Sequence, residues 1–151
     1  MLRLTRKLTL AVEAVVDIAC HGIDGPVQSQ DIAGRLALPK RYLEQVMQQL
    51  VRSGILKGVR GPRGGYRLAR EPARITVGDV FRAVRTGDDE EDRVSFGSAS
   101  LLGQEIMAPF WASVENDLMR RLDIVSIDGL VHNTRARLID RLEIAAAEAA
   151  D

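Results

Sequence analysis

The sequence is poor in the residues from which catalytic and metal centres are usually built. Its 151 residues include a single cysteine, Cys20, and two histidines, His21 and His132. One cysteine excludes an intrachain disulfide and a metal site made from the cysteines of one chain. We find no Ser/His/Asp set and no spaced group of metal ligands in the sequence, so we expect neither an enzyme nor a resident metal or cofactor.

Long hydrophobic segments are also missing. No apolar run approaches about twenty residues, and no charged start followed by an apolar stretch marks a secretory signal. We therefore expect a cytoplasmic protein that does not bind a membrane. Hydrophobic residues still make up 46% of the chain, which is enough to build a core.

The net charge is zero, but the charges are divided unevenly along the chain. Residues 1–87 hold fifteen Lys and Arg against seven Asp and Glu, a net charge of +8. Residues 88–151 hold six Lys and Arg against fourteen Asp and Glu, a net charge of −8. A basic half favours contact with nucleic acid, while the acidic half keeps the whole chain soluble.

The spacing of apolar residues predicts a mainly α-helical fold with one short β-hairpin. Ser29 and Thr76 are expected as helix N-caps, Thr76 in a capping box with Asp79, and Gly54 is expected to end a helix. The expected helices are 4–21, 30–38, 39–52, 77–85, 109–123 and 134–149, and the expected strands are 55–60 and 66–69. Two short helices joined by a tight turn and followed by a two-stranded β wing make a winged helix-turn-helix.

The third expected helix has the composition of a DNA-recognition helix. One stripe of it is apolar and belongs in the core, namely Leu43, Val46, Met47 and Leu50. The opposite stripe carries side chains that read base edges, namely Arg41, Glu44, Gln45 and Gln48. Contacts with the phosphates of the DNA backbone are expected from Lys40, from Tyr42, and from Ser29 and Gln30 at the start of the preceding helix. The alternative is an ordinary solvated helix face.

The stretch "VRGPRGGYRLAR" is both sharply turned and positively charged. Its glycines permit backbone angles that other residues avoid, and Pro62 stiffens the tip. These glycines are Gly61, Gly64 and Gly65. A narrow finger of this kind can enter a minor groove, where we expect Arg60 and Arg63, whereas Arg67 and Arg70 lie further back, towards phosphates. The alternative is a plain surface hairpin.

Together these motifs resemble the Rrf-type family of bacterial winged-helix regulators, the group of IscR, NsrR and CymR. The resemblance rests on "RLTRK", "GPVQSQDIAGRLALPKRYLEQVMQQLVRSGIL", "VRGPRGGYRLAR" and "ITVGDVFRAV", and more loosely on "FW…DLMRRLDIVSIDGLV". It implies a homodimer on a roughly palindromic operator. It also implies a backbone clamp at the "RLTRK" start, with Thr5 and Lys7. Pro39 and Arg63 stand where the family usually has Ser and Gly.

The resemblance divides the chain into four parts. They are a winged helix-turn-helix domain at 1–87, an acidic mobile loop at 88–100, a dimerisation helix with a short helix at 101–133, and a C-terminal helical extension at 134–151. The expected dimer contacts form an apolar stripe with heptad-like spacing, namely Met107, Phe110, Trp111, Val114, Leu118 and Leu122. The alternative is that this stripe packs against its own domain.

Many members of this family carry three cysteines between the "RAV" helix and the long helix, and these hold an iron–sulfur cluster. Here that segment has neither Cys nor His, and Ala108 stands where some members place a ligating His. Such clusters need thiolates, so no intrinsic cluster is expected. The acidic run "DDEED" is expected to be solvated rather than to hold a hard cation. Cys20 is the candidate for a redox-sensitive residue, with inert packing as the alternative.

The sequence therefore predicts a sequence-specific DNA-binding transcriptional regulator, acting as a homodimeric repressor without an iron–sulfur cluster. Its expected partners are double-stranded operator DNA, a second copy of the chain, and a regulatory protein or small ligand. One alternative is a winged-helix module that binds protein rather than DNA. Another is a DNA-binding regulator controlled by a partner protein or by oxidation of Cys20.

Overall fold

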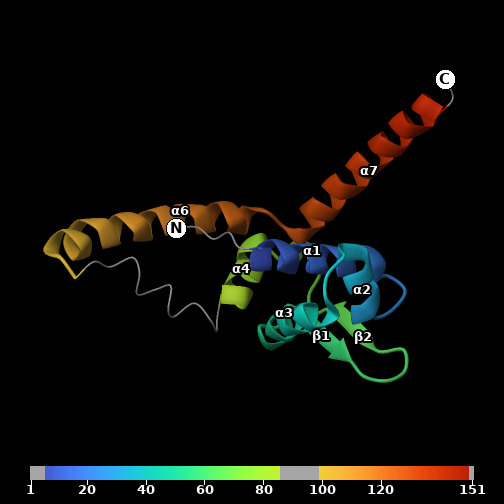
Figure 1. Ribbon diagram of the computed structural model, residues 1–151, viewed down its shortest axis with the longest axis horizontal. Helices are drawn as coiled ribbons and strands as arrows, with labels where there is room; N and C mark the ends of the chain where they lie inside the picture. Colours follow the sequence, from blue (N-terminus) through green and yellow to red (C-terminus); the bar gives the residue numbers. More distant parts are fainter. Residues whose placement is uncertain (1–5, 86–98, 150–151) are drawn as a thin grey trace.

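The protein folds into a helical body from which two long helices project (Figure 1). The computed structural model describes residues 6–85 and 99–149, so Thr5 and nearly all of the expected acidic loop lie outside the described residues. Its elements are α1 (Arg6–His21), α2 (Ser29–Leu36), α3 (Lys40–Arg52), β1 (Leu56–Val59), β2 (Gly65–Leu68), the 3₁₀-helix η1 (Pro72–Arg74), α4 (Val77–Arg85), the π-helical turn η3 (Gly103–Met107), α6 (Ala108–Ile124) and α7 (Ile127–Ala149). This architecture confirms the predicted fold class. None of the described helices is long and apolar enough to cross a membrane.

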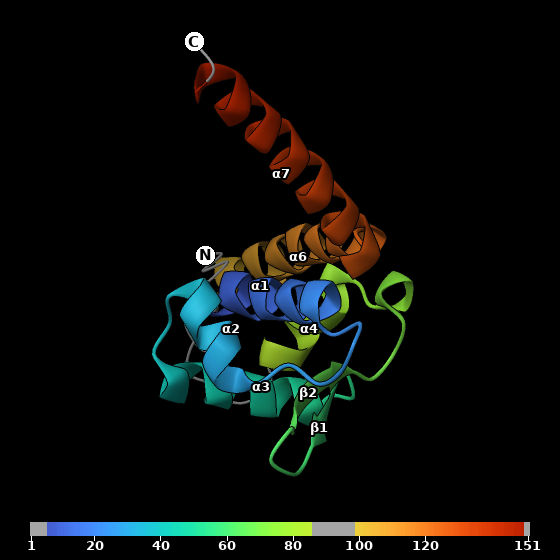
Figure 2. The same cartoon turned by 90° about the vertical axis from the view of Figure 1, so that its right-hand side faces the viewer.

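Helix α1 crosses the centre of the body (Figure 2) and buries one side along its length. The apolar stripe predicted for α3 is confirmed, because Leu43, Val46, Met47 and Leu50 are all buried in the same hydrophobic cluster as α1. Since α3 commits this face to the core, its opposite face is left at the surface.

A buried carboxylate fixes α2 against α1. Asp17 on α1 is 8% exposed and accepts two hydrogen bonds from Arg35 on α2, Nε to Oδ1 and Nη2 to Oδ2, each at 2.8 Å. Two parallel bonds set both the distance and the orientation of the two helices. Ala37 then adopts a left-handed backbone, φ 52°, which turns the chain sharply from α2 into α3.

Two of the predicted helix ends are confirmed and one is wrong. Thr76 and Asp79 form a reciprocal capping box, with the Asp79 amide donating to Thr76 Oγ1 and the Thr76 amide donating to Asp79 Oδ2, both at 3.0 Å. Gly54, with φ 72°, ends α3 as expected. Ser29 is not the N-cap of α2, because Gln28 holds the extended backbone of that position and Ser29 is already helical.

Strands β1 and β2 pair antiparallel and form the wing. Val27, in the connection between α1 and α2, exchanges two backbone hydrogen bonds with Tyr66 of β2, at 2.9 and 2.8 Å. This short bridge holds the base of the wing to the body, so the direction of the wing is set by backbone contacts as well as by side chains.

The wing glycines serve two different purposes. Gly61 has a φ of 114°, as expected for a residue chosen for its backbone freedom. That explanation is wrong for Gly64 and Gly65, because neither has a positive φ. A Cβ atom would instead lie 2.3 Å from the carbonyl oxygen of Val59 at Gly64 and 2.3 Å from that of Val27 at Gly65. These two glycines allow backbone segments to approach closely.

Helices α6 and α7 join the body at the elbow, residues 125–126. The Val77 amide donates to the Val125 carbonyl at 2.9 Å, and the Ile127 amide donates to the Ile75 carbonyl at 2.8 Å. Ile75 and Ile127 are fully buried beneath these bonds. The elbow is therefore anchored to the short segment between η1 and α4.

The expected helix start at Thr134 is wrong, because α7 runs without a break from Ile127 to Ala149. The stretch "SIDG" begins this helix: the Gly129 amide donates to Ser126 Oγ at 3.1 Å, as at an N-cap. Beyond Val131 the described side chains of α7 are exposed, and the helix projects away from the body (Figures 1 and 2).

Replacing Gly65 with Ala should loosen the wing, because the added methyl group would meet the backbone of Val27. We expect Gly65→Ala to lower the free energy of unfolding by about 1–3 kcal/mol, the range typical of overpacking. Gly58→Ala is the matched control in the same wing, since no described atom lies within 4 Å of an added Cβ there. Urea denaturation measures both variants, and equal losses would show that Gly65 does not provide close approach.

Candidate DNA-binding face

The outward side of α3 presents the residues predicted to read bases. Arg41, Gln45 and Gln48 are exposed and Glu44 is half-buried. Lys40 Nζ lies 3.9 Å from Glu44 Oε1, one helical turn away. The structure thus brings the predicted base-reading set onto one polar face, opposite the buried stripe.

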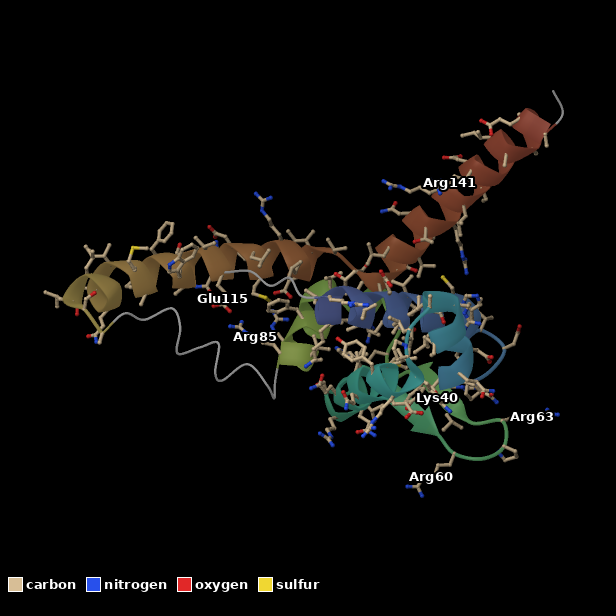
Figure 3. The ribbon with its side chains drawn as sticks, viewed as in Figure 1. Lys40, Arg60, Arg63, Arg85, Glu115 and Arg141 are labelled. Carbon is tan, nitrogen blue, oxygen red and sulfur yellow. The ribbon has the colours of Figure 1, made fainter. Side chains whose placement is uncertain are left out.

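The wing lies on the same side of the molecule as this face. Arg60, Arg63 and Arg67 are exposed. Figure 3 shows Arg60 and Arg63 on the wing loop near Lys40, on the side of the body opposite α6 and α7. Arg63 does not adopt a left-handed backbone, so it replaces the family's glycine without strain.

Tyr66 of β2 is half-buried at the base of the wing. Burial raises the pKa of the Tyr66 phenol, and the negative charge of Glu44 adds to this rise. Helix α3 itself contacts the wing through β1. The sequence alone did not single out Tyr66, because its neighbour Glu44 lies far away along the chain.

A depression of about 330 Å³, here called the basic groove, extends the polar face from α3 towards the start of α1. Its lining residues are Lys7, Tyr42, Gln45, Val46, Gln48, Gln49 and Arg52. Lys7 and Tyr42 were predicted as backbone contacts, whereas Gln49 and Arg52 were missed. Each follows a residue predicted to read bases by one helical turn, Gln49 after Gln45 and Arg52 after Gln48, and this spacing was the available signal. Within the described part of the chain, the buried Gln49 Oε1 has no hydrogen-bond partner.

The pairing of β1 with β2 adds Lys57 to the candidate residues, which the sequence pattern did not indicate. Lys57 of β1 lies directly opposite Arg67 of β2, and both side chains are exposed. Like charges directly opposite each other destabilise an antiparallel pair. Only the strand register brings these two residues together, so the linear sequence carries no clear sign of the pair.

The remaining predicted backbone contacts lie at the start of α2. Ser29 is half-buried and Gln30 is exposed, both in the first turn. Gln30 Nε2 donates to Gln28 Oε1 at 2.9 Å. Tyr42 is half-buried, as expected for a side chain divided between core and surface.

The apolar stripe predicted for dimer contacts divides between two environments. Met107 and Phe110 are exposed, and Trp111, Val114, Leu118 and Leu122 are half-buried. Helix α6 contacts α4, while its first turns extend beyond the body (Figure 1). Exposed Leu101, Leu102 and Ile106 enlarge the apolar surface at that end. The stripe therefore packs partly against its own domain and partly faces solvent.

A helix-turn-helix whose second helix exposes a polar face with arginine and glutamine side chains, beside an arginine-bearing hairpin, defines the winged helix-turn-helix class of DNA-binding proteins. Residues 4–133 match the Rrf2 family model, described as an iron-dependent transcriptional regulator. The chain belongs to the Rrf2 family.

Named relatives agree with this assignment. The chain is 35% identical over 150 residues to the HTH-type transcriptional regulator IscR of Aliivibrio salmonicida (strain LFI1238), covering 97% of this chain and 88% of the relative. Among solved structures it resembles T. potens IscR, with a TM-score of 0.68, 32% identity and 88% of each chain covered. It also resembles CymR (YrzC), the global cysteine regulator of B. subtilis, with a TM-score of 0.70, 27% identity, and 88% of this chain and 98% of CymR covered.

The chain is thus a DNA-binding transcriptional regulator and not an enzyme. The alternative of a winged-helix module that binds only protein is set aside.

The residues present do not fit an iron–sulfur cluster held by thiolates. The full sequence has one cysteine and two histidines, and residues 86–110 contain neither type. Within residues 6–85 and 99–149, no three His, Cys, Asp or Glu side chains come together to hold a metal ion.

Cys20 is half-buried near the end of α1. Burial raises the pKa of the Cys20 thiol, and the nearby positive charge of Arg135 offsets only part of this rise. A raised pKa lowers the fraction of reactive thiolate at neutral pH. This environment favours inert packing over redox sensing.

Proposed function

We propose that the protein is a homodimeric, cytoplasmic repressor that reads a palindromic operator without an intrinsic iron–sulfur cluster. The observation that carries the proposal is the placement of the polar face of α3 and the arginines of the wing on one side of the molecule (Figure 3). A dimer on promoter DNA would exclude RNA polymerase from the same site, which is the basis for proposing repression.

In the proposed complex, α3 enters the major groove and the wing enters the flanking minor groove. Arg41, Glu44, Gln45 and Gln48 read bases, since their side chains can pair with guanine, cytosine or adenine edges. Arg60 and Arg63 are the minor-groove side chains.

Contacts with DNA phosphates are proposed around these base contacts. We assign Lys7 and Arg52 to one backbone strand, because both line the basic groove at the end of the polar face. We assign Lys57 and Arg67 to another, because a phosphate between them would relieve their mutual repulsion. Ser29, Gln30, Lys40 and Tyr42 stay as proposed backbone contacts, and Thr5 is proposed from the sequence alone.

Arg60→Ala should weaken operator affinity about tenfold, because a lost groove contact is usually worth about 1–3 kcal/mol. Gln45→Ala should instead broaden the preferred base at its position. Fluorescence anisotropy on the selected operator measures the first effect, and selection from a randomised site library measures the second. Arg74→Ala is the control, since Arg74 is an exposed arginine on η1, which contacts α7. Unchanged affinity in Arg60→Ala would remove the wing from the binding site.

Lys57→Gln should affect stability and DNA binding in opposite directions. Removing one of two opposed positive charges should raise the melting temperature of the free protein slightly. Losing one phosphate contact should reduce the slope of log K against log salt by about one unit, without changing base preference. Differential scanning calorimetry and binding at several salt concentrations give the two readouts. An unchanged salt slope would show that Lys57 does not contact a phosphate.

The exposed apolar end of α6 supports the proposed dimer. Phe110 is 53% exposed although its ring stacks edge-on against Trp111 at 5.2 Å between centroids. Leu101, Leu102 and Ile106, in the turns just before α6, are also exposed, and exposed apolar surface of this kind is usually covered by a partner. Two copies of one helix related by a two-fold axis would cover it symmetrically.

Phe110→Asp should convert the dimer to a monomer, because it places a charge in the proposed apolar contact. Sedimentation equilibrium measures the mass in solution. Asn116→Asp adds the same charge to α6 at an exposed position outside the predicted stripe and should stay dimeric. A wild-type protein that sediments as a monomer would refute the proposed dimer.

A further inference from the structure

Helix α4 holds α6 through two arginines on its last turn. Arg82 Nη2 donates to Asp123 Oδ2 at 2.6 Å, in the last turn of α6. Arg85 pairs with Glu115, and the two side chains face each other in Figure 3. Asp123 and Glu115 are eight residues apart, which is about 12 Å along a helix axis. Two contacts at this separation fix the direction of α6 relative to the body, as well as its position.

A close contact at Gly78 reinforces the first pair. Gly78 is buried in the first turn of α4, and a Cβ atom there would lie 1.8 Å from Asp123 Oδ1. The Asp123 carboxylate therefore rests against the bare backbone of α4. Any side chain at position 78 would push this carboxylate away from Arg82.

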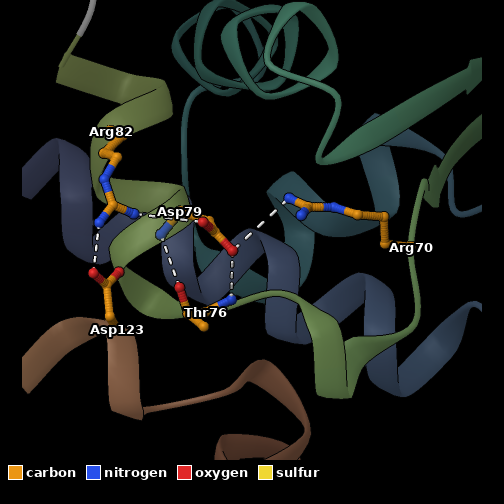
Figure 4. Close-up of polar contacts among 5 residues, drawn as sticks. All are labelled: Arg70, Thr76, Asp79, Arg82 and Asp123. Atoms are coloured by element: carbon orange, nitrogen blue, oxygen red, sulfur yellow. Dashed lines mark hydrogen bonds and ion pairs between the residues drawn. The ribbon is translucent and has the colours of Figure 1, made fainter. Parts of the chain in front are cut away.

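The same cluster reaches the wing. Arg82 Nη1 lies 3.5 Å from Asp79 Oδ1, and Arg70, just after β2, lies 3.9 Å from Asp79 Oδ2. Figure 4 shows these side chains converging between the end of the wing, α4 and α6. Asp79 also belongs to the capping box with Thr76, so its carboxylate is held in place.

We propose that Arg82 and Arg85 are positioning residues that set the spacing between operator half-sites. The inference rests on the proposed dimer: if two copies meet through α6, the direction of α6 determines how far apart the two recognition helices lie. A rotation of about 8° over the roughly 25 Å length of a seventeen-residue helix moves its end by about 3.5 Å, or one base-pair step. Small changes in these ion pairs thus change the spacing between half-sites by a whole base pair.

The pairs are suited to this role because they contribute little to overall stability. The side chains of Arg82 and Asp123 are 52% and 40% exposed, and ion pairs this accessible to water stabilise a fold only weakly. The backbone hydrogen bonds at the elbow, together with the buried Ile75 and Ile127, keep α6 attached when a pair is lost. The two arginines therefore set the angle of α6 relative to the body and contribute little to the stability of the fold.

Three variants test the proposal by two routes. Asp123→Asn and Glu115→Gln remove the charge of one partner with little change of shape. Gly78→Ala keeps every charge and displaces the Asp123 carboxylate by contact. The matched control is Asp117→Asn, which removes the same charge from α6 but pairs with Arg120 of the same helix, at 3.5 Å.

The measurement is selection of operators from a library in which two half-sites are separated by a variable spacer. Wild type and Asp117→Asn should select one spacing. In the three test variants the preference for that spacing over its neighbours should fall about fivefold, the lower end of the usual coupling between linked sites. Affinity for a single half-site, base preference and melting temperature should stay close to wild type in Asp123→Asn and Glu115→Gln.

The outcomes are distinguishable. If Asp123→Asn and Glu115→Gln select the same spacing as sharply as wild type, the positioning role is refuted, whatever the behaviour of Gly78→Ala. If they lose half-site affinity and spacing preference together, their role is structural and the proposal also fails. If wild type itself selects isolated half-sites, the proposed dimer is wrong, and this result is separate from any effect of the variants.

Discussion

The two backbone hydrogen bonds at the elbow are the constraint that joins the parts of this molecule. They tie residues 75 and 77, between the wing and α4, to residues 125 and 127, between α6 and α7. Because Ile75 and Ile127 are fully buried beneath them, water has little access to compete for these bonds. Side-chain packing adds to this anchor, since α6 contacts α4 and the first turns of α7 pack against α1 and the core.

The uneven division of charge acquires a structural explanation from the same region. The basic half supplies Arg82 and Arg85 to α6, and the acidic half supplies Asp123 and Glu115 as their partners. The positive charges of Arg82 and Arg85, which face α6, are thereby paired within the chain. The arginines of the wing lie on the opposite side, where they are exposed and available to an anionic ligand (Figure 3). A net charge of zero is thus compatible with a strongly basic face.

Features that depend on neighbours along the chain could be predicted from the sequence. The buried stripe of α3, the capping box at Thr76 and the glycine end at Gly54 all follow from local spacing and are confirmed. The last helix was expected to start at Thr134, although Ser126 accepts the Gly129 amide where α7 actually starts. A serine that accepts the amide three residues on looks the same in sequence as one in a turn.

Features that depend on distant segments could not be predicted in the same way. Gly65 is required by Val27, which lies in a different connection, and Lys57 meets Arg67 only through the register of the wing. The exposed candidates of the face, such as Arg41 and Gln45, were found from residue type, but Arg52 needed the shape of the basic groove. Residue type identifies the chemistry of a site, whereas its extent depends on packing.

Because the sequence lacks ligands for an iron–sulfur cluster, a regulatory signal must act on a different part of the fold. Helix α3 is committed on one side to the core and, in the proposed complex, on the other side to DNA, so it has little freedom to respond to a signal. The contact between α4 and α6 is different, because its side chains are partly exposed and its loss need not unfold the chain. A ligand or partner that competes for those arginines could alter DNA binding from the opposite side of the molecule. Its effect would be transmitted as a change in the angle of α6, and base recognition itself would be left intact.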